Sequence, residues 1–90
     1  MSVKIQIPTP LREHTGGLPE VTVAGGTVQA ALDDLVKQYP SIGSKLFDNG
    51  RLRPYINIFL NDEDIRFLDE MATAVKDGEI VALIPAVAGG

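Results

Sequence analysis

The side chains of this sequence offer few groups that could do chemistry together. His14 is the single histidine, and the absence of cysteine excludes a cysteine nucleophile, a disulfide and a cysteine-ligated metal site. The acidic stretch 61–64 lacks the ligand spacing of a calcium loop, so it predicts a polar hairpin turn. Gly25, Gly26 and Thr27 precede a helical pattern without a P-loop lysine, which favours a turn and a helix N-cap over a phosphate site. We therefore predict a non-enzymatic chain with no bound metal or cofactor, in which His14 is a solvated loop residue.

The carboxyl terminus offers a different kind of chemistry. Five residues follow Pro85: Ala86, Val87, Ala88, Gly89 and Gly90. When extended, such a segment spans about 17 Å. Glycines without a Cβ can pass through a narrow channel. The Gly90 carboxylate is a poor acyl donor until one oxygen becomes a leaving group. Adenylation with ATP by a partner would achieve that, and a sulfide source would then convert the acyl-adenylate into a thiocarboxylate. We expect a folded domain over 1–85 and a flexible tail over 86–90.

Composition limits the remaining function classes. Ninety residues with 44% apolar and 22% charged content predict one globular domain. The net charge of −4 and the lack of a basic stripe argue against nucleic acid as a partner. No apolar run is long enough for a membrane span, and the first residues do not resemble a secretion signal. These features favour the cytoplasm.

Periodicity predicts the main elements. Apolar residues alternate over 3–7, 20–24 and 55–60, which indicates half-buried strands, and 79–85 is an apolar strand. The stretch 28–39 carries apolar residues at helical spacing, so it predicts an amphipathic helix that ends before Pro40.

Three shorter stretches are less regular. Residues 42–47 predict one further helical turn, ended by the Asp-Asn-Gly that follows. Residues 65–67 predict a short strand after the turn at 61–64. The stretch 68–76 stays open between a loop and a turn of helix.

One main helix can cover only one face of a sheet of four or five strands. In the last strand, Val81 and Leu83 are expected under this helix. Ala82 and Ile84 would then lie on the open face beside Phe59. We predict that Phe59, Ala82 and Ile84 form a patch that binds a partner; the alternative is that they are scattered surface residues.

Three stretches in register carry a family resemblance: IPTPLREHTGG, YINIFLNDEDIRF and ALIPAVAGG. With the strand order, the single helix and the terminal Gly-Gly, they resemble the ubiquitin-like β-grasp proteins of the ThiS/MoaD sulfur carrier family. Within that family the chain is most similar to the CysO-type carriers of cysteine biosynthesis. The resemblance covers nearly the whole chain and implies an α+β fold with a mixed sheet of four to five strands.

The resemblance also implies a function and its partners. Gly90 would be the site of adenylation and thiocarboxylation, with Gly89 before it. An ATP-dependent activating enzyme related to ubiquitin-activating and MoeB-type proteins would charge the carrier. A pyridoxal-phosphate cysteine synthase acting on O-phosphoserine would receive the sulfur, and a metal-dependent peptidase would release cysteine. The alternatives are a MoaD-type small subunit of molybdopterin synthase, a β-grasp interaction domain whose tail is never activated, and a protein modifier.

Overall fold

The computed structural model describes residues 2–85, whereas Met1 and residues 86–90 lie outside the described part of the chain. Short 3₁₀ helices are labelled η. In chain order the elements are β1 (Ser2–Gln6), η1 (Thr9–Thr15), β2 (Glu20–Ala24), α1 (Val28–Gln38), η2 (Pro40–Ile42), α2 (Gly43–Leu46), β3 (Phe47–Asp48), β4 (Arg51–Leu52), β5 (Ile56–Leu60), β6 (Glu63–Asp64), η3 (Ile65–Phe67), η4 (Glu70–Ala72) and β7 (Ile80–Pro85). Within residues 2–85, none of the helices has the length and the apolar character that a membrane span requires.

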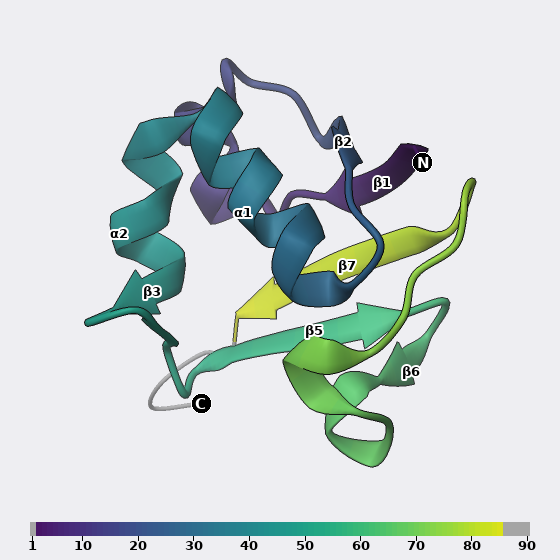
Figure 1. The fold of residues 1–90 in the computed structure, drawn as a ribbon. Helices are drawn as coiled ribbons and strands as arrows, with labels where there is room; N and C mark the ends of the chain where they lie inside the picture. The colour runs from purple at the N-terminus through teal and green to yellow at the C-terminus, as the bar shows by residue number, and fades with distance from the viewer. Residues whose placement is uncertain (1, 86–90) are drawn as a thin grey trace.

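Five strands form one mixed sheet in the order β2-β1-β7-β5-β6 (Figure 1). The first and last strands, β1 and β7, lie side by side in parallel, and every other pair in this sheet is antiparallel. The final strand therefore lies in the middle of the sheet, with a hydrogen-bonded neighbour on each side. This arrangement confirms the predicted mixed sheet of four to five strands and fixes the number at five.

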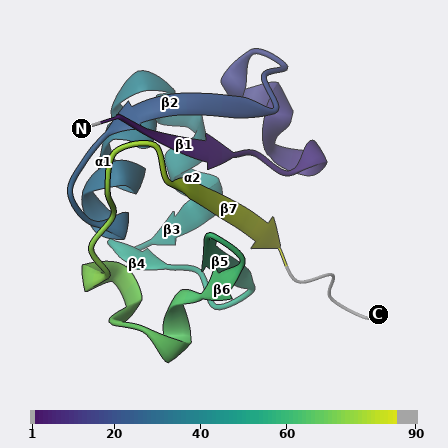
Figure 2. The same cartoon turned by 90° about the vertical axis from the view of Figure 1, so that its right-hand side faces the viewer.

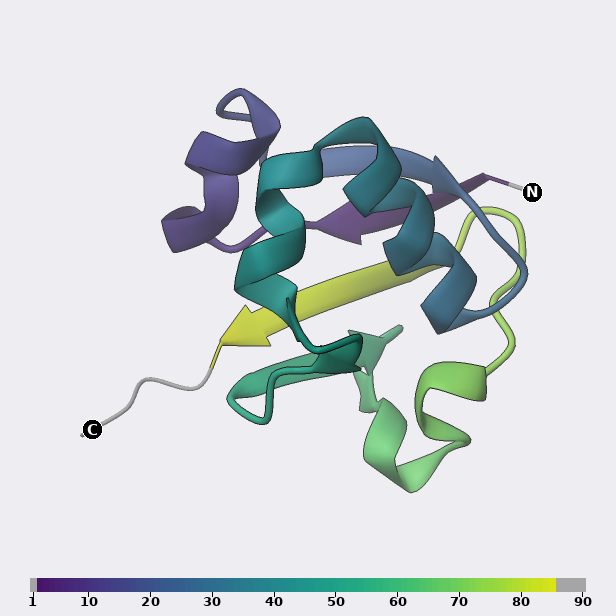
Figure 3. The ribbon, with the colours of Figure 1, turned by 60° about the vertical axis from the view of Figure 1, so that its left-hand side comes forward.

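The helix α1 packs across one face of the sheet (Figure 3). The side chain of Thr27 caps it by accepting a hydrogen bond of 3.1 Å from the backbone N–H of Ala30, as the sequence predicts. The helix ends at Gln38, before Pro40. Its buried face consists of Val28, Ala31, Leu32 and Leu35. Burial of each leucine contributes about 1.5–3 kcal/mol to stability, so this face anchors the fold.

The strands beneath α1 alternate as their sequences predict. In β1, Val3 and Ile5 are buried while Lys4 is exposed. In β7, Val81 and Leu83 are buried beneath the helix. Because side chains on a strand point alternately to its two faces, the even-numbered residues of β7 face the open side of the sheet.

The structure corrects the strand expected at 65–67. The turn at Asn61 and Asp62 has positive φ at both residues and connects β5 to β6. The partner strand then ends at Asp64, because the Asp64 carboxylate accepts hydrogen bonds from the backbone N–H and the guanidinium of Arg66. These bonds cap the 3₁₀ helix η3, so the chain turns away from the sheet.

A hairpin that the sequence reading missed follows α2. Helical structure continues through Ile42 to Leu46 as predicted, but Phe47 begins β3. Asn49 and Gly50 both have positive φ, which gives the two-residue turn that joins β3 to β4. The open question at 68–76 is resolved by the short helix η4.

Candidate functional site

The base of the predicted tail is held rigidly by the sheet. β7 runs between β1 and β5 and ends at Pro85, which lies opposite Ile56 (Figure 2). The neighbouring pair joins Ile84 to Asn57. β1 pairs with β7 only at residues 80–82, so the end of β7, where the chain leaves the sheet, is held in place by its pairing with β5. The predicted tail residues Val87, Ala88, Gly89 and Gly90 lie outside the described residues.

The predicted patch lies on the open face of the sheet, next to that exit point. Phe59 is directly opposite Ala82 in the ladder between β5 and β7, so their side chains share a face. Both are half-buried, while the side chain of Ile84 is 44% exposed. The structure thus confirms that the three residues face away from α1. We call Phe59, Ala82 and Ile84 the open-face patch; its role in binding a partner stays a prediction.

A hollow of about 570 Å³ adjoins the open-face patch. Ala82 and Ile84 line one side, and Pro8 and Arg12 line another. The Arg12 side chain is held in place because its Nε donates a 3.0 Å hydrogen bond to the carbonyl of Ile7. Glu20 also lines the hollow, so this arrangement places one charge of each sign beside an apolar surface.

Sequence reasoning missed Arg12 because nothing in its spacing marks it. It becomes part of this hollow only through the fold of η1, which returns the chain toward β7.

The ion pair between Lys4 and Glu20, 3.7 Å apart on β1 and β2, is half-exposed at both ends. Such surface pairs contribute little to stability.

The remaining sequence candidates have structural roles. His14 was predicted to be a solvated loop residue, and this is wrong, because its side chain is only 17% exposed. Its Nδ1 lies 3.1 Å from the hydroxyl oxygen of Ser41, where η1 packs against η2. Hydrogen bonds from Arg66 hold the pKa of Asp64 below its ordinary value, so this carboxylate stays ionised and caps η3.

The comparisons with known proteins agree with this geometry. The model of the ThiS family matches residues 5–90. The chain belongs to the ThiS family. It is 46% identical to the sulfur carrier protein CysO of Mycobacterium tuberculosis, over the full length of both chains. It also matches one chain of a solved complex of BexX and CysO from Amycolatopsis orientalis, with a TM-score of 0.90, 42% identity, and coverage of 98% of this chain and 99% of that chain.

A third relative is named as a protein modifier and not as a sulfur carrier. The solution structure of the small archaeal modifier protein 1 from Methanosarcina acetivorans matches with a TM-score of 0.88 and 32% identity, over 99% of this chain and 96% of that chain. These ThiS-family likenesses confirm the β-grasp fold and the predicted family. They also confirm the prediction that the chain is of the sulfur carrier type and is not an enzyme. The solved complex also shows that carriers of this kind assemble with partner proteins.

Proposed function

We propose that this ThiS-family chain carries sulfur as a thiocarboxylate on Gly90 and donates it for the biosynthesis of cysteine from O-phosphoserine. The observation that supports this most strongly is the 46% identity to a CysO sulfur carrier over the whole of both chains. The family match extends through residue 90, so it includes the terminal Gly89 and Gly90. The absence of cysteine fits the proposal, because the sulfur is attached to a carboxyl group and needs no thiol of the carrier.

The proposed charging proceeds in two balanced steps on a partner enzyme. An oxygen of the Gly90 carboxylate attacks the α-phosphorus of ATP, which forms the acyl-adenylate and releases pyrophosphate. A sulfide equivalent then attacks the acyl carbon, and AMP leaves with the oxygen that linked it. The product is the thiocarboxylate. The carrier holds no cofactor in this scheme, since the activating enzyme binds the ATP, and the reaction would take place in the cytoplasm.

Docking would combine the tail with the open-face patch. The exit point at Pro85 lies next to Ile84, so a partner that receives the tail also meets Ile84 and Ala82. Apolar contact with this patch would provide affinity, while Arg12 and Glu20 in the adjoining hollow would pair with complementary charges of the partner. The proposed partners are a MoeB-like activating enzyme, a pyridoxal-phosphate cysteine synthase, and a metal-dependent peptidase that releases the product.

The likeness to a small archaeal modifier protein favours a second candidate function. In that case the activated Gly90 would be transferred to the amino group of a lysine on another protein, and an isopeptide bond would replace the thiocarboxylate. Both functions need adenylation at the same carboxylate. They differ only in the nucleophile that attacks the acyl-adenylate or its successor.

Intact mass spectrometry separates these functions. The purified chain is incubated with its activating enzyme, ATP and a sulfide source. A carrier gains the mass difference between sulfur and oxygen, a modifier appears as conjugates on other proteins, and a plain interaction domain stays unchanged. Deletion of Gly90 should abolish charging while leaving the melting temperature unaltered. Charging of the deleted chain would contradict the assignment of Gly90.

A further inference from the structure

The strand β2 forms one edge of the five-stranded sheet and pairs with β1 on its inner side. The N–H of Ile7 donates to the carbonyl of Pro19 at 2.8 Å, which fixes where the hydrogen-bonded pairs of this ladder fall. Because bonded pairs alternate along an antiparallel ladder, every second residue of β2 directs its peptide groups outward, namely Glu20, Thr22 and Ala24. An outward row of this kind is a template for a further strand.

Two side chains of α1 occupy this edge. The carboxylate of Asp34 accepts a 2.9 Å hydrogen bond from the N–H of Ala24. The side-chain amide of Gln38 donates to the carbonyl of Thr22 at 3.2 Å and to the Asp34 carboxylate at 3.0 Å. One residue of an added parallel strand would form bonds of the same kind with these two backbone groups. We call Asp34 and Gln38 the β2 clasp.

The spacing of the β2 clasp matches the spacing of the strand. Side chains four residues apart lie on one face of a helix, about 6 Å apart along its axis. Residues two apart on a strand are separated by about 7 Å, so Asp34 and Gln38 reach Ala24 and Thr22 together. Hydrogen bonds from Ala24 and Gln38 hold the pKa of Asp34 below its ordinary value, so this carboxylate is an ionised acceptor at neutral pH.

The outer edge of β2 is suited to pairing with the same edge of a second copy of the chain. In an antiparallel pair centred on Thr22, the two threonines lie opposite each other and each Glu20 lies opposite an Ala24, so no like charges meet. The side chains of these three residues are exposed. The β2 clasp opposes this pairing, because it occupies the Thr22 carbonyl and the Ala24 N–H that the second copy would need.

We propose that the β2 clasp keeps this chain a monomer by blocking the pairing of β2 with β2 of a second copy. Such a two-fold pair would join the two sheets into one. Pro19 and Glu20 line the hollow beside the open-face patch, so the second copy would lie at the rim of that hollow. The β2 clasp thereby keeps the hollow accessible to other partners. The proposal is independent of the chemistry at Gly90.

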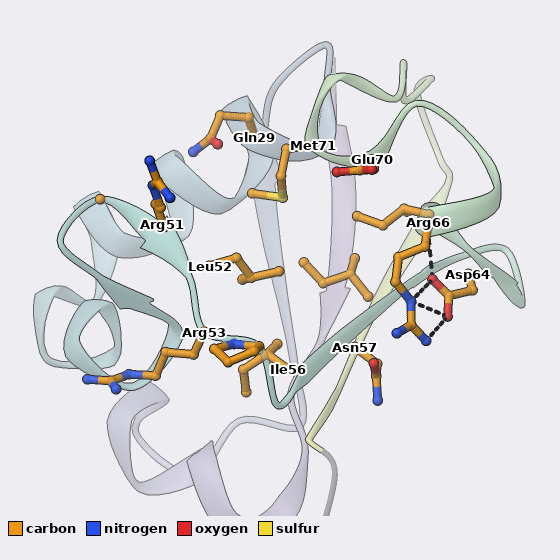
Figure 4. Close-up of a pocket in the computed structure, with 14 residues that line it drawn as sticks. Gln29, Arg51, Leu52, Arg53, Ile56, Asn57, Asp64, Arg66, Glu70 and Met71 are labelled. Carbon is orange, nitrogen blue, oxygen red and sulfur yellow. Dashed lines mark hydrogen bonds and ion pairs between the residues drawn. The ribbon is translucent and has the colours of Figure 1, made fainter.

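A matched pair on the same helix provides a control. The side-chain amide of Gln29 donates to the carboxylate of Asp33 at 2.8 Å, so the same two residue types interact across the same spacing. Gln29 lies on the flank of α1 toward β4 and β5, where it lines a hollow of about 480 Å³ with Leu52 and Met71 (Figure 4). Among the hydrogen bonds of residues 2–85, this pair makes none to β2.

The test is sedimentation velocity of the chain with Asp34→Ala and Gln38→Ala, followed up to millimolar concentration. This double variant should dimerise at least about tenfold more tightly than the unmodified chain, because each freed hydrogen bond contributes a factor of roughly 2 to 12 to association. The chain with Gln29→Ala and Asp33→Ala loses the same groups from the same helix. It should sediment like the unmodified chain.

Amide hydrogen exchange then locates the contact. The N–H of Thr22 points outward and has no partner among residues 2–85, so it should exchange more slowly in the dimer than in the monomer. Far-UV circular dichroism checks that the double variant folds. If it does not, Gln38→Ala alone serves as the test, because it frees the Thr22 carbonyl and leaves the bond from Ala24 to Asp34 in place.

Three results would overturn the proposal. The first is a folded variant without Gln38 that stays monomeric at millimolar concentration. The second is equal association of the Gln29 and Asp33 control variant. The third is a dimer in which the Thr22 N–H exchanges as fast as in the monomer, since the copies would then meet through another surface.

Discussion

The turn before α1 offers a sharp test of the packing, because two adjacent glycines there have opposite surroundings. A Cβ built on Gly25 would lie 2.6 Å from the backbone nitrogen of Ala31 and 2.9 Å from the carbonyl carbon of Ala30. These atoms belong to the first turns of α1, so they cannot rotate away as a side chain would. A Cβ on Gly26 would meet nothing within 4 Å.

Gly25→Ala should therefore force α1 away from the segment before it. Overpacking of this kind costs typically 1–3 kcal/mol, and the rigid backbone neighbours favour about 2–3 kcal/mol here. For a domain of this size, that loss lowers the melting temperature by roughly 8–24 °C. Gly26 does not have a positive φ, so Gly26→Ala should be neutral or stabilise the chain by up to about 1 kcal/mol, because alanine restricts the unfolded chain.

Urea and thermal unfolding, followed by far-UV circular dichroism, measure both variants against the unmodified chain. The difference between the two alanine variants is the decisive quantity, since it cancels any general effect of adding a methyl group near the helix. If the two stabilities agree within about 0.5 kcal/mol, the close approach of Gly25 to α1 is wrong.

Three further variants test other parts of the structure. Leu35→Ala should lower the free energy of unfolding by about 2–5 kcal/mol in a urea titration, and a loss near zero would contradict the burial of α1. Asp64→Asn should lower the melting temperature at pH 7, and this loss should shrink as the pH falls below 3.8. Hydrogen bonds from Arg66 lower the pKa of Asp64 below 3.8, so its stabilisation is present above that pH and is lost as the pH falls through the lowered value; an equal loss at pH 7 and well below pH 3.8 would contradict this. Ile84→Asp should weaken binding to the activating enzyme in calorimetry, whereas Thr22→Asp on the exposed face of β2 should not; equal effects would remove the open-face patch from the interface.

Local periodicity was sufficient to predict the elements that carry the core. Burial of one face produces the helical spacing from Val28 to Leu35 and the alternation in β1 and β7. Such patterns can be recognised within a few consecutive residues. The outward direction of Ala82 and Ile84 follows from the same alternation.

Features that depend on contacts between distant segments were not predictable in this way. Arg66 turns the chain away from the sheet through hydrogen bonds to a side chain, where apolar spacing predicted a strand. His14 is covered because η1 packs against η2, and no pattern near His14 indicates that contact. Arg12 likewise reaches the hollow beside the open-face patch only because η1 folds back toward β7. The hairpin at Asn49 and Gly50 differs from these cases, because a local signal for it exists. The Asn-Gly dipeptide is typical of a two-residue hairpin turn, although we interpret it from the sequence as the end of a helix.

The central claim is that a rigid domain presents the carboxyl group of Gly90 to a partner for activation. Fragmentation mass spectrometry of the charged chain tests it most directly, because it locates the added sulfur along the sequence. We predict that the replacement of oxygen by sulfur lies on Gly90 alone, and that a chain extended by one alanine gains no sulfur at that residue. Sulfur attached at any residue of 1–85, or charging of the chain without ATP, would contradict the account.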